Sequence, residues 1–444
     1  MPQPATTPTG TRASRLLAAW CAVALLGACG ADDPPAASGP NVVVILVDDL
    51  GWADAGTGAS AAPKTPRIDA LLADSARPRT YRTAPMCTPA RAGLLTGVEP
   101  AKLGMLRNLG AREGGGLPPE ATTLAERFRS AGWSTALVGK WHLGHSRPGS
   151  RPNAQGFERF RGFLGGWIEP TTRKRGAEAD WWRDESPVEQ QGYAPAMLLE
   201  EARRAILERP RGKPFFLWFA TPLPHAPLHA PPGAVLPENL PEGAELNRAA
   251  MRSMVEELDR HVGVLLDLLA AEGLERETVV VFASDNGGDR DLGADNGGLR
   301  AGKYTPWEGG LRTRFALRLP GRVAAGERDC DISYLDLAPT LCSMAGIAAD
   351  SREFDGLDTS ATWLRGAQLA PRMLRYACER SDERRVAVVE DGRKLVRIVS
   401  KSGAKSTTLH DLRADPGEAG ELYPADDARS ARWIEAAREL EGWR

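Results

Sequence analysis

Four oxygen-bearing side chains follow apolar runs of the chain. Asp48 and Asp49 come after one such run, and Asp285 and Asn286 come after another. Adjacent carboxylates in a partly buried place repel each other strongly unless a cation lies between them. These groups are hard oxygen ligands without imidazole or thiolate, which favours Ca²⁺, or Mg²⁺, over zinc. Taken separately, each pair would also suit a turn or a helix cap.

A cysteine opens a second segment that could do chemistry. Cys87 begins the sequence Cys-Thr-Pro-Ala-Arg, in which Arg91 lies four residues on and so one helical turn away. Pro89 suits the first turn of a helix, where its missing N–H removes no hydrogen bond. Residue 87 would then lie near a positive helix end, which favours a developing negative charge. The structural alternative is a small buried thiol ahead of a helix.

Four continuous apolar runs indicate the strands that position these residues. They are Val42–Val47, Thr135–Val138, Phe215–Phe219 and Thr278–Phe282. Helical spacing lies between them, in Ala121–Ala131, Ala196–Glu208 and Asn247–Glu272. The pattern predicts an α/β domain built on a mainly parallel sheet that is buried on both faces.

Each apolar run leads into polar residues. In parallel sheets, ligands bind beyond the carboxyl ends of the strands. We therefore expect one site formed by the residues that follow the four runs: Asp48 and Asp49, Lys140 and His142, His225, and Asp285 and Asn286.

Six ordered motifs resemble those of type I sulfatases, a family of the alkaline-phosphatase-like superfamily. They are Asp48-Asp49, Cys87 to Arg91 with a trailing Leu-Thr-Gly, Gly-Lys-Trp-His-Leu-Gly at 139–144, Pro-His-Ala-Pro at 224–227, Ser-Asp-Asn-Gly at 284–287, and Lys303 ahead of Glu308-Gly309-Gly310. The similarity runs from about Asn41 to Pro416. It departs at Arg312-Thr313-Arg314, where many relatives have Val-Pro after the Arg, and this affects local packing rather than chemistry.

The resemblance implies hydrolysis of a sulfate ester by a formylglycine hydrate. A maturation enzyme would oxidise Cys87 to the aldehyde, and Arg91 would orient the hydrate. A divalent ion would bind residue 87 together with the side chains of Asp48, Asp49, Asp285 and Asn286. An aldehyde is preferable to serine because a serine sulfate ester has no second hydroxyl to collapse.

The resemblance also implies roles for two lysines and two histidines. Lys140 and Lys303 would hold the sulfate oxygens, and His225, with or without Lys303, would protonate the leaving alcohol. His142 would take the proton from the remaining hydrate hydroxyl, so that sulfate leaves and the aldehyde returns. The ordinary alternatives are core or surface histidines, solvated lysines and an arginine paired with a helix-face acid.

The N-terminus has the pattern of an export signal. Arg12 and Arg15 precede an apolar run, Leu16–Leu26, that is too short to span a bilayer comfortably and ends on small residues. The sequence Leu-Gly-Ala-Cys resembles a bacterial lipobox, in which Cys29 carries the lipid. Gly30, in place of Asp, favours the outer membrane of a Gram-negative host. The alternative is ordinary cleavage and release of a soluble secreted protein.

We expect four parts along the chain. These are a lipoprotein signal peptide (1–28), a flexible tether (29–40), a catalytic domain (41–350) and a smaller C-terminal α/β subdomain with a short antiparallel sheet (351–444). In the last part, Asp391-Gly392 predicts a hairpin turn, and Ala428–Glu441 predicts a closing helix. Ser333–Gly346 has helical spacing, and the stretch from there to about Ala370 is expected to be irregular.

Composition excludes some partners. The chain has 56 Lys and Arg against 58 Asp and Glu, a formal net charge of −2, so no global field favours nucleic acid. Two of the six cysteines belong to the export signal. With Cys87 converted, Cys330, Cys342 and Cys378 could form at most one internal disulfide, or none.

An aromatic and basic insert between Phe157 and Pro195 favours a sulfated glycan as substrate, with aryl and alkyl sulfates left open. It contains Trp167, Trp181, Trp182, Arg173, Lys174, Arg175 and Arg183. Such side chains stack on sugar rings and pair with further sulfates. Core packing and a solvated loop are the structural alternative.

Two other functions compete with sulfate ester hydrolysis. A phosphate or phosphonate ester hydrolase of the same superfamily would use the same metal, lysines and histidines. A surface lipoprotein that binds glycans without turnover would need none of the Cys87 chemistry, and the intact motif speaks against it.

Overall fold

The computed structural model of the chain describes residues 38–57, 62–110, 114–237, 241–380, 382–422 and 428–442. The predicted signal peptide, Cys29 and most of the predicted tether lie outside these ranges. Within them, no helix combines the length and the apolar character that a membrane crossing requires.

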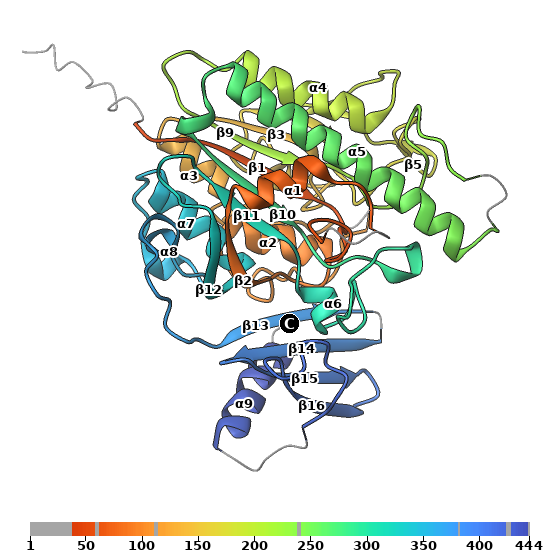
Figure 1. The fold of residues 1–444 in the computed structure, drawn as a ribbon, viewed down its shortest axis with the longest axis vertical. Helices are drawn as coiled ribbons and strands as arrows, with labels where there is room; N and C mark the ends of the chain where they lie inside the picture. Colours follow the sequence, from red (N-terminus) through yellow and green to blue (C-terminus); the bar gives the residue numbers. More distant parts are fainter. Residues whose placement is uncertain are drawn as a thin grey trace, which may run out of the picture. The chain divides into compact units, whose positions relative to one another are not determined.

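A ten-stranded mixed sheet carries the site (Figure 1). Its strands, in spatial order, are β12 (Gly326–Ser333), β2 (Ala76–Arg82), β11 (Phe315–Arg318), β10 (Thr278–Ser284), β1 (Asn41–Val47), β9 (Phe215–Ala220), β3 (Ser134–Lys140), β4 (Arg159–Phe163), β7 (Trp182–Arg183) and β8 (Ser186–Pro187). The four strands predicted from apolar runs are neighbours, β10-β1-β9-β3, and all pair in parallel. This confirms the predicted parallel core, while antiparallel pairing begins at β11 and β7.

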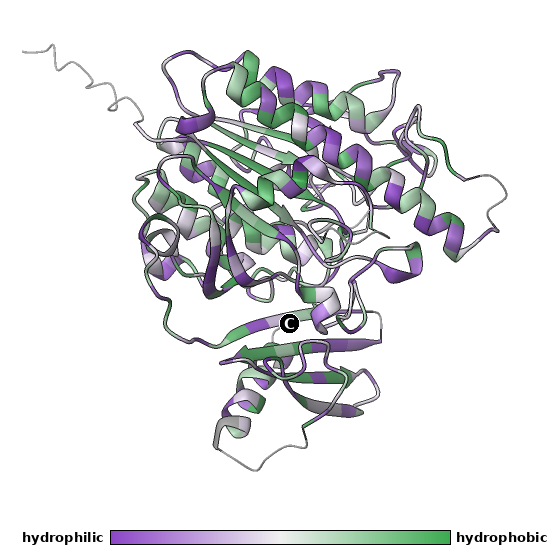
Figure 2. Ribbon diagram, viewed as in Figure 1, coloured by the Kyte–Doolittle hydropathy of each residue, from purple (hydrophilic) through white to green (hydrophobic). Residues whose placement is uncertain are grey.

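Helices cover both faces of this sheet. Alternate residues of β1 point to opposite sides, and since residues 42–47 are all apolar, both faces must be buried. Val43, Ile45 and Val47 pack in one cluster with residues of α1 (Pro66–Ala73), α4 (Ala194–Leu207) and α5 (Ala244–Ala271). Val42, Val44 and Leu46 pack in another with residues of α2 (Cys87–Thr96), α3 (Leu124–Ser130) and α7 (Leu337–Met344). Figure 2 shows the consequence: the central strands are coloured as hydrophobic, whereas α5 alternates between hydrophobic and hydrophilic residues.

The helix predicted over Ala121–Ala131 begins three residues late, at Leu124, for a local reason. The Thr123 side chain accepts a hydrogen bond from the Glu126 N–H, and the Glu126 carboxylate accepts one from the Thr123 N–H. This capping box satisfies the free N–H groups of the first turn and fixes the helix start.

A four-stranded antiparallel sheet forms the C-terminal part. Its strands are β13 (Leu374–Glu379), β14 (Glu383–Glu390), β15 (Arg393–Ser400) and β16 (Lys405–Asp411), and α9 (Ala428–Gly442) packs on it. The predicted hairpin turn is confirmed, since Asp391 and Gly392 have φ of 52° and 75°, as a primed turn requires. The closing helix is also confirmed, with Trp433 and Leu440 buried.

The stretch before Ala370 is not irregular throughout, and that expectation is wrong for one helix, α8 (Ser360–Arg365). Trp363 is buried in this helix, with its ring stacked 5.6 Å from that of Phe315. One buried aromatic side chain, rather than a repeating apolar pattern, anchors the helix, so periodicity could not reveal it. The described cysteines Cys330, Cys342 and Cys378 are all buried and unpaired.

Candidate active site

The carboxyl ends of β1, β3 and β10 meet at one edge of the sheet, as predicted. Backbone hydrogen bonds continue past the strands, because the Asp285 N–H donates to the Val47 carbonyl and the Asp48 N–H to the Leu223 carbonyl. At the end of β3, Gly139 comes so close to β9 that a Cβ atom would lie 1.9 Å from the Ala220 carbonyl oxygen. A glycine is therefore required directly before Lys140.

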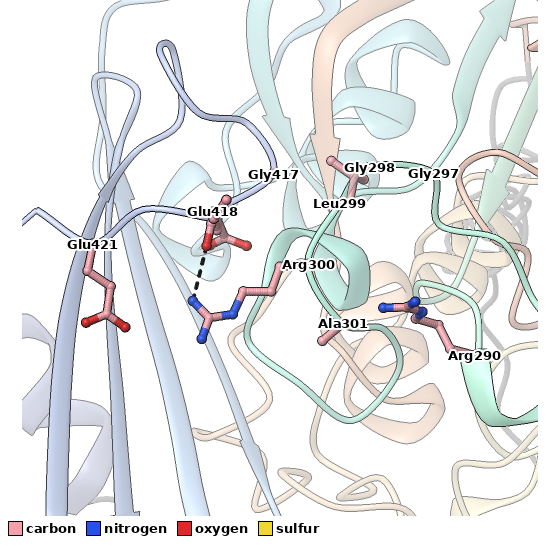
Figure 3. Close-up of a pocket in the computed structure, with 10 residues that line it drawn as sticks. Arg290, Gly297, Gly298, Leu299, Arg300, Ala301, Gly417, Glu418 and Glu421 are labelled. Atoms are coloured by element: carbon pink, nitrogen blue, oxygen red, sulfur yellow. Dashed lines mark hydrogen bonds between the residues drawn. The ribbon is translucent and has the colours of Figure 1, made fainter.

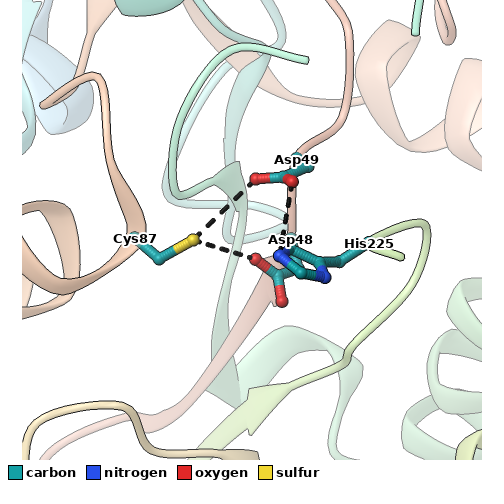
Figure 4. A group of neighbouring side chains, drawn as sticks. All are labelled: Asp48, Asp49, Cys87 and His225. Carbon is teal, nitrogen blue, oxygen red and sulfur yellow. Dashed lines mark hydrogen bonds and ion pairs between the residues drawn. The ribbon is translucent and has the colours of Figure 1, made fainter. Parts of the chain in front are cut away.

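Three carboxylates and one amide are buried at this edge. Asp48, Asp49, Asp285 and Asn286 are each no more than 1% exposed. Asp49 has φ of 65°, a left-handed conformation that Asp tolerates. It breaks the strand alternation, so that two consecutive carboxylates can turn to one place. Figure 4 shows them beside Cys87 and His225, and the potential ligand atoms of these four residues all lie within 4.8 Å of one another.

This donor set fits a hard divalent cation. Asn286 donates from Nδ2 to Asp49 Oδ1 at 2.6 Å, yet its buried Oδ1 has no hydrogen-bond partner in the described part of the chain. A buried amide oxygen without a partner is costly, and Ca²⁺ and Mg²⁺ both bind such oxygens. Burial, and next the neighbouring Asp48, raise the pKa of Asp285, and although Arg91 and Lys140 lower it, the net value is about 6.

Three basic side chains surround the carboxylates. Lys140 Nζ lies 2.7 Å from Asp48 Oδ2, and Lys303 Nζ lies 2.6 Å from Asp49 Oδ2. Both lysines are at most 5% exposed, so neither is a solvated surface lysine. Burial raises the pKa of Asp49, but Lys303, His225 and Lys140 outweigh it, and the net pKa lies well below its usual range.

Arg91 extends from α2 into the same group of charges. Its Nη2 lies 2.8 Å from Asp285 Oδ2, and its Nη1 donates to the Lys140 carbonyl at 3.1 Å. The acid it pairs with therefore belongs to the site, not to its own helix face. This contact ties α2 to the ends of β3 and β10.

Cys87 is the first residue of α2, as predicted, and is 1% exposed. Its Sγ lies 3.6 Å from Asp48 Oδ1 and 3.9 Å from Asp49 Oδ1. Burial raises the pKa of the thiol, whereas Lys140 and Lys303 lower it, and the net shift is downward. A group at this position thus faces both the carboxylates and the two ammonium groups that would bind an anion.

Thr88 is a positioning residue that the sequence reading missed. Its hydroxyl donates to the His142 carbonyl at 3.0 Å and accepts from the Leu109 N–H at 3.2 Å. Its N–H donates to Asn108 Oδ1 at 3.1 Å. Thr88 stands inside the Cys-x-Pro-x-Arg motif, but at a position the motif leaves unspecified, so no signal marked it.

The two histidines differ in electrostatic environment. His142 Nε2 lies 3.3 Å from the Leu109 carbonyl oxygen, which can only accept, so this nitrogen carries the proton. Its Nδ1 is buried and meets no partner among the described residues. Burial, followed by Lys140 and Arg91, places the pKa of His142 well below its usual value, so the ring is neutral with an open lone pair.

His225 has the opposite tendency. Its Nδ1 is directed at the Ala226 carbonyl, and its Nε2 lies 3.6 Å from Asp49 Oδ2. Burial and Lys303 lower the pKa of His225, but Asp49 and Asp48 raise it more, so the net shift is upward. This ring tends to hold a proton, whereas that of His142 tends to accept one.

A buried four-member charge network supports the segment that carries Lys303. Glu308, at the start of α6 (Glu308–Leu311), pairs with Arg82 Nε at 2.9 Å and with Lys394 Nζ at 3.1 Å. Lys394 Nζ also lies 2.8 Å from Glu418 Oε1, and each of the four side chains is at most 3% exposed. Two acids and two bases compensate one another, so the C-terminal sheet holds the Lys303 segment in place.

A surface hollow lies beside this network (Figure 3). Arg300 borders it, donating to the Glu418 carbonyl at 3.1 Å and placing its guanidinium 3.7 Å from the Trp307 ring centre. Arg290 lies on the other side of the hollow and Glu421 beyond Glu418. The hydrogen bond from Arg300 to Glu418 is a second link between the Lys303 segment and the C-terminal part.

The aromatic and basic insert divides into buried and half-buried or exposed residues. Trp181 and Trp182 are buried, and the guanidinium of the buried Arg173 donates to the Thr171, Gln190 and Gly192 carbonyls. These three residues therefore stabilise the fold, as the structural alternative predicts. Trp167 and Arg175 are only half-buried.

The parallel sheet, its acidic edge and the helix that starts at Cys87 have the architecture of the alkaline-phosphatase-like superfamily. Residues 40–347 match the family model described as Sulfatase. The chain is 34% identical over 394 residues to N-acetylgalactosamine-6-sulfatase of Mus musculus, covering 82% of this chain and 73% of that protein. It is 31% identical over 459 residues to arylsulfatase A of Bos taurus, covering 91% and 88%.

Solved structures agree with these relatives. The crystal structure of Ps i-CgsB in complex with k-i-k-neocarrahexaose matches with a TM-score of 0.82 and 28% identity, over 91% of this chain and 93% of that one. The chain therefore belongs to the sulfatase family and is a sulfuric ester hydrolase.

Loss of the His142 ring should strongly reduce turnover without unfolding the protein. In His142→Ala, we expect the rate of 4-nitrophenyl sulfate hydrolysis to fall by about 10²–10⁴-fold, as for loss of a positioned proton acceptor. Stability should change by about 1 kcal/mol, because the ring makes one hydrogen bond. Lys303→Ala should strongly reduce turnover too, and the exposed Lys174→Ala serves as control. Near-normal rates in both site variants would overturn the assignment.

Removal of the Glu308 charge should destabilise the protein in a pH-dependent way. Burial raises the pKa of Glu308, but Arg82 and Lys394 lower it to about 2, from a usual 4.5. The stabilisation is therefore complete above pH 4.5 and is lost as the pH falls toward 2. We expect Glu308→Gln to lose about 3–5 kcal/mol at pH 7, the cost of breaking a buried ion pair.

Urea unfolding at pH 7, 5 and 3.5 measures this difference. The exposed Glu353→Gln, which loses only a surface pair with Arg127, should cost about 0–1 kcal/mol. A Glu308→Gln loss that stayed constant from pH 7 to 3.5 would contradict the electrostatic explanation.

Proposed function

We propose that this sulfatase hydrolyses a sulfate ester of a sulfated carbohydrate, using a formylglycine hydrate made from Cys87 and a divalent cation. The observation that carries the proposal is the position of Cys87 Sγ, 3.6 Å from Asp48 Oδ1, at the start of α2. Two similar proteins support a carbohydrate, since one is an N-acetylgalactosamine-6-sulfatase and the other was crystallised in complex with k-i-k-neocarrahexaose.

Asp48, Asp49, Asp285 and Asn286, with residue 87, would hold the cation, Ca²⁺ or Mg²⁺. When bound, it draws negative charge from the attacking oxygen and from the sulfate. Lys140 and Lys303 are buried donors already placed at the carboxylates, and they would bind the sulfate oxygens in a site where charges are poorly screened. Arg91, fixed by Asp285, would orient residue 87.

Proton transfer is divided between the two histidines. His225, whose pKa is raised by Asp49, holds a proton for the leaving alcohol oxygen. His142, neutral and open at Nδ1, accepts the proton of the second hydroxyl of residue 87, so that the S-bound oxygen leaves with sulfate and the aldehyde is restored. The opposite pKa shifts support opposite roles.

The domain boundaries and the location of the protein belong to the same proposal. Residues 41–350 would form the catalytic domain and 351–444 the C-terminal subdomain. The chain would be exported by the signal at 1–28, with a lipid on Cys29 and a tether at 29–40, or else released as a secreted protein. A maturation enzyme in the host would be its first partner.

Protein from the native host should carry an aldehyde in place of the Cys87 thiol. Mass spectrometry of the peptide that contains residue 87 measures this, and Cys87→Ala supplies an inactive reference. The same preparation should release sulfate from 4-nitrophenyl sulfate faster than phosphate from 4-nitrophenyl phosphate. Faster phosphate release would favour a phosphoryl hydrolase, and an unmodified cysteine in fully active protein would refute the formylglycine mechanism.

Removal of the cation should lower both activity and stability. After dialysis against EDTA, we expect turnover to be lost and the midpoint of thermal unfolding to fall, both restored by Ca²⁺ or Mg²⁺. Binding at 100 times the dissociation constant stabilises a protein by about 2.7 kcal/mol. Asp48→Asn should unfold at the same temperature with and without Ca²⁺, so an equal calcium response in this variant would place the cation elsewhere.

A further inference from the structure

The segment Gly165-Gly166-Trp167 borders both histidines of the site. A Cβ atom on Gly166 would lie only 2.7 Å from the His142 ring, so residue 166 has space for no side chain. The next residue, Trp167, lines a narrow pocket together with Asp48 and His225. The segment therefore borders both histidines to which proton transfer is assigned.

Arg175 lies beside the same segment, at the turn of a short hairpin formed by β5 (Lys174–Arg175) and β6 (Glu178–Ala179). Its guanidinium carbon is 5.9 Å from the centre of the Trp167 ring. Its Nη1 would lie 3.0 Å from a Cβ atom on Gly165. The positive charge also contributes to the lowered pKa of His142, as its closeness to the site requires.

The Arg175 side chain has donor capacity to spare. Its Nη1 is a buried atom without a hydrogen-bond partner, as far as the described residues go. Asp180, the acid that also borders Gly165, accepts from the Leu164 N–H at 2.9 Å and the Gly165 N–H at 2.7 Å. Asp180 Oδ1 also accepts from Trp182 Nε1 at 2.8 Å, so other donors already occupy this carboxylate. A buried guanidinium donor with no acceptor is costly unless a ligand supplies one.

We propose that Trp167 and Arg175 form a specificity-determining subsite for the leaving alcohol, and that this alcohol is a saccharide with a second anionic group. The inference rests on the proposed function. The sugar ring packs on the Trp167 indole, and Arg175 binds a second sulfate or a carboxylate in the planar geometry that guanidinium favours. Within the aromatic and basic insert, Trp167 and Arg175 therefore recognise the substrate. The buried Arg173, Trp181 and Trp182 maintain the fold.

Four substrates test the subsite with the mature, metal-loaded enzyme. They are 4-methylumbelliferyl sulfate, a disaccharide with one sulfate and no other charge, the same disaccharide with a second sulfate, and the monosulfated disaccharide with an added carboxylate. We compare kcat/KM for each doubly anionic disaccharide with kcat/KM for the monosulfated one. In Arg175→Gln, we expect this ratio to fall by roughly 10- to 100-fold, as for loss of a charge-assisted hydrogen bond. The loss should appear in KM, and the substrate that loses more identifies the second anion.

Two further variants complete the test. Trp167→Leu should reduce kcat/KM for the monosulfated and the doubly anionic disaccharides by similar factors, because stacking does not depend on the second charge. Lys174→Gln, whose exposed side chain neighbours Arg175 on the same strand, should keep the wild-type ratio. Unfolding midpoints of all variants show whether the fold is intact.

The outcomes separate the subsite from the proposed function. An unchanged ratio in Arg175→Gln, or an equal loss on all four substrates, would overturn the subsite while leaving sulfate ester hydrolysis in place. Release of sulfate from the aryl ester alone, by the wild-type enzyme, would also overturn it. If the wild-type enzyme releases sulfate from none of the four, the proposed function itself fails.

Discussion

Three carboxylates with almost no solvent exposure share one edge of the sheet, and the rest of the site depends on compensating them. Each buried, unpaired carboxylate would cost several kcal/mol. Lys140, Lys303 and Arg91 bring three positive groups to Asp48, Asp49 and Asp285. These groups come from three different parts of the chain, so compensation of charge also fixes where β3, α2 and the Lys303 segment must lie.

This constraint extends to the C-terminal part. The Lys303 segment is held through Glu308, which pairs with Lys394 of β15 and, through it, with Glu418. The small antiparallel sheet therefore contributes no group to the acidic cluster but determines the position of one that does. In this protein the two sheets form one functional unit.

Much of the fold and the site could be predicted, because the signals were local. Continuous apolar runs marked β1, β3, β9 and β10, and parallel pairing then required the polar residues after them to meet. The strand β2 carried no such signal: its sequence, ARPRTYR, is polar and contains a proline, and it is a strand because β11 and β12 pair with it. The partners of Glu308 lie 86 and 226 residues away in sequence, and no pattern connects them. The roles of the residues in the aromatic and basic insert could not be predicted for a related reason. Trp181 and Trp167 have the same side chain, and only their burial in the folded protein distinguishes them.

The burial of α2 sets an order of events in the life of the protein. All ten residues of this helix are buried, and Cys87 is 1% exposed. An enzyme that oxidises Cys87 cannot reach it in the folded state, so under the proposed function it must bind the nascent or unfolded chain. Maturation and folding then compete in time, and a chain that folds first is locked in an inactive form that is stable. The yield of active enzyme in the cell would be decided by relative rates, not by the stability of the product.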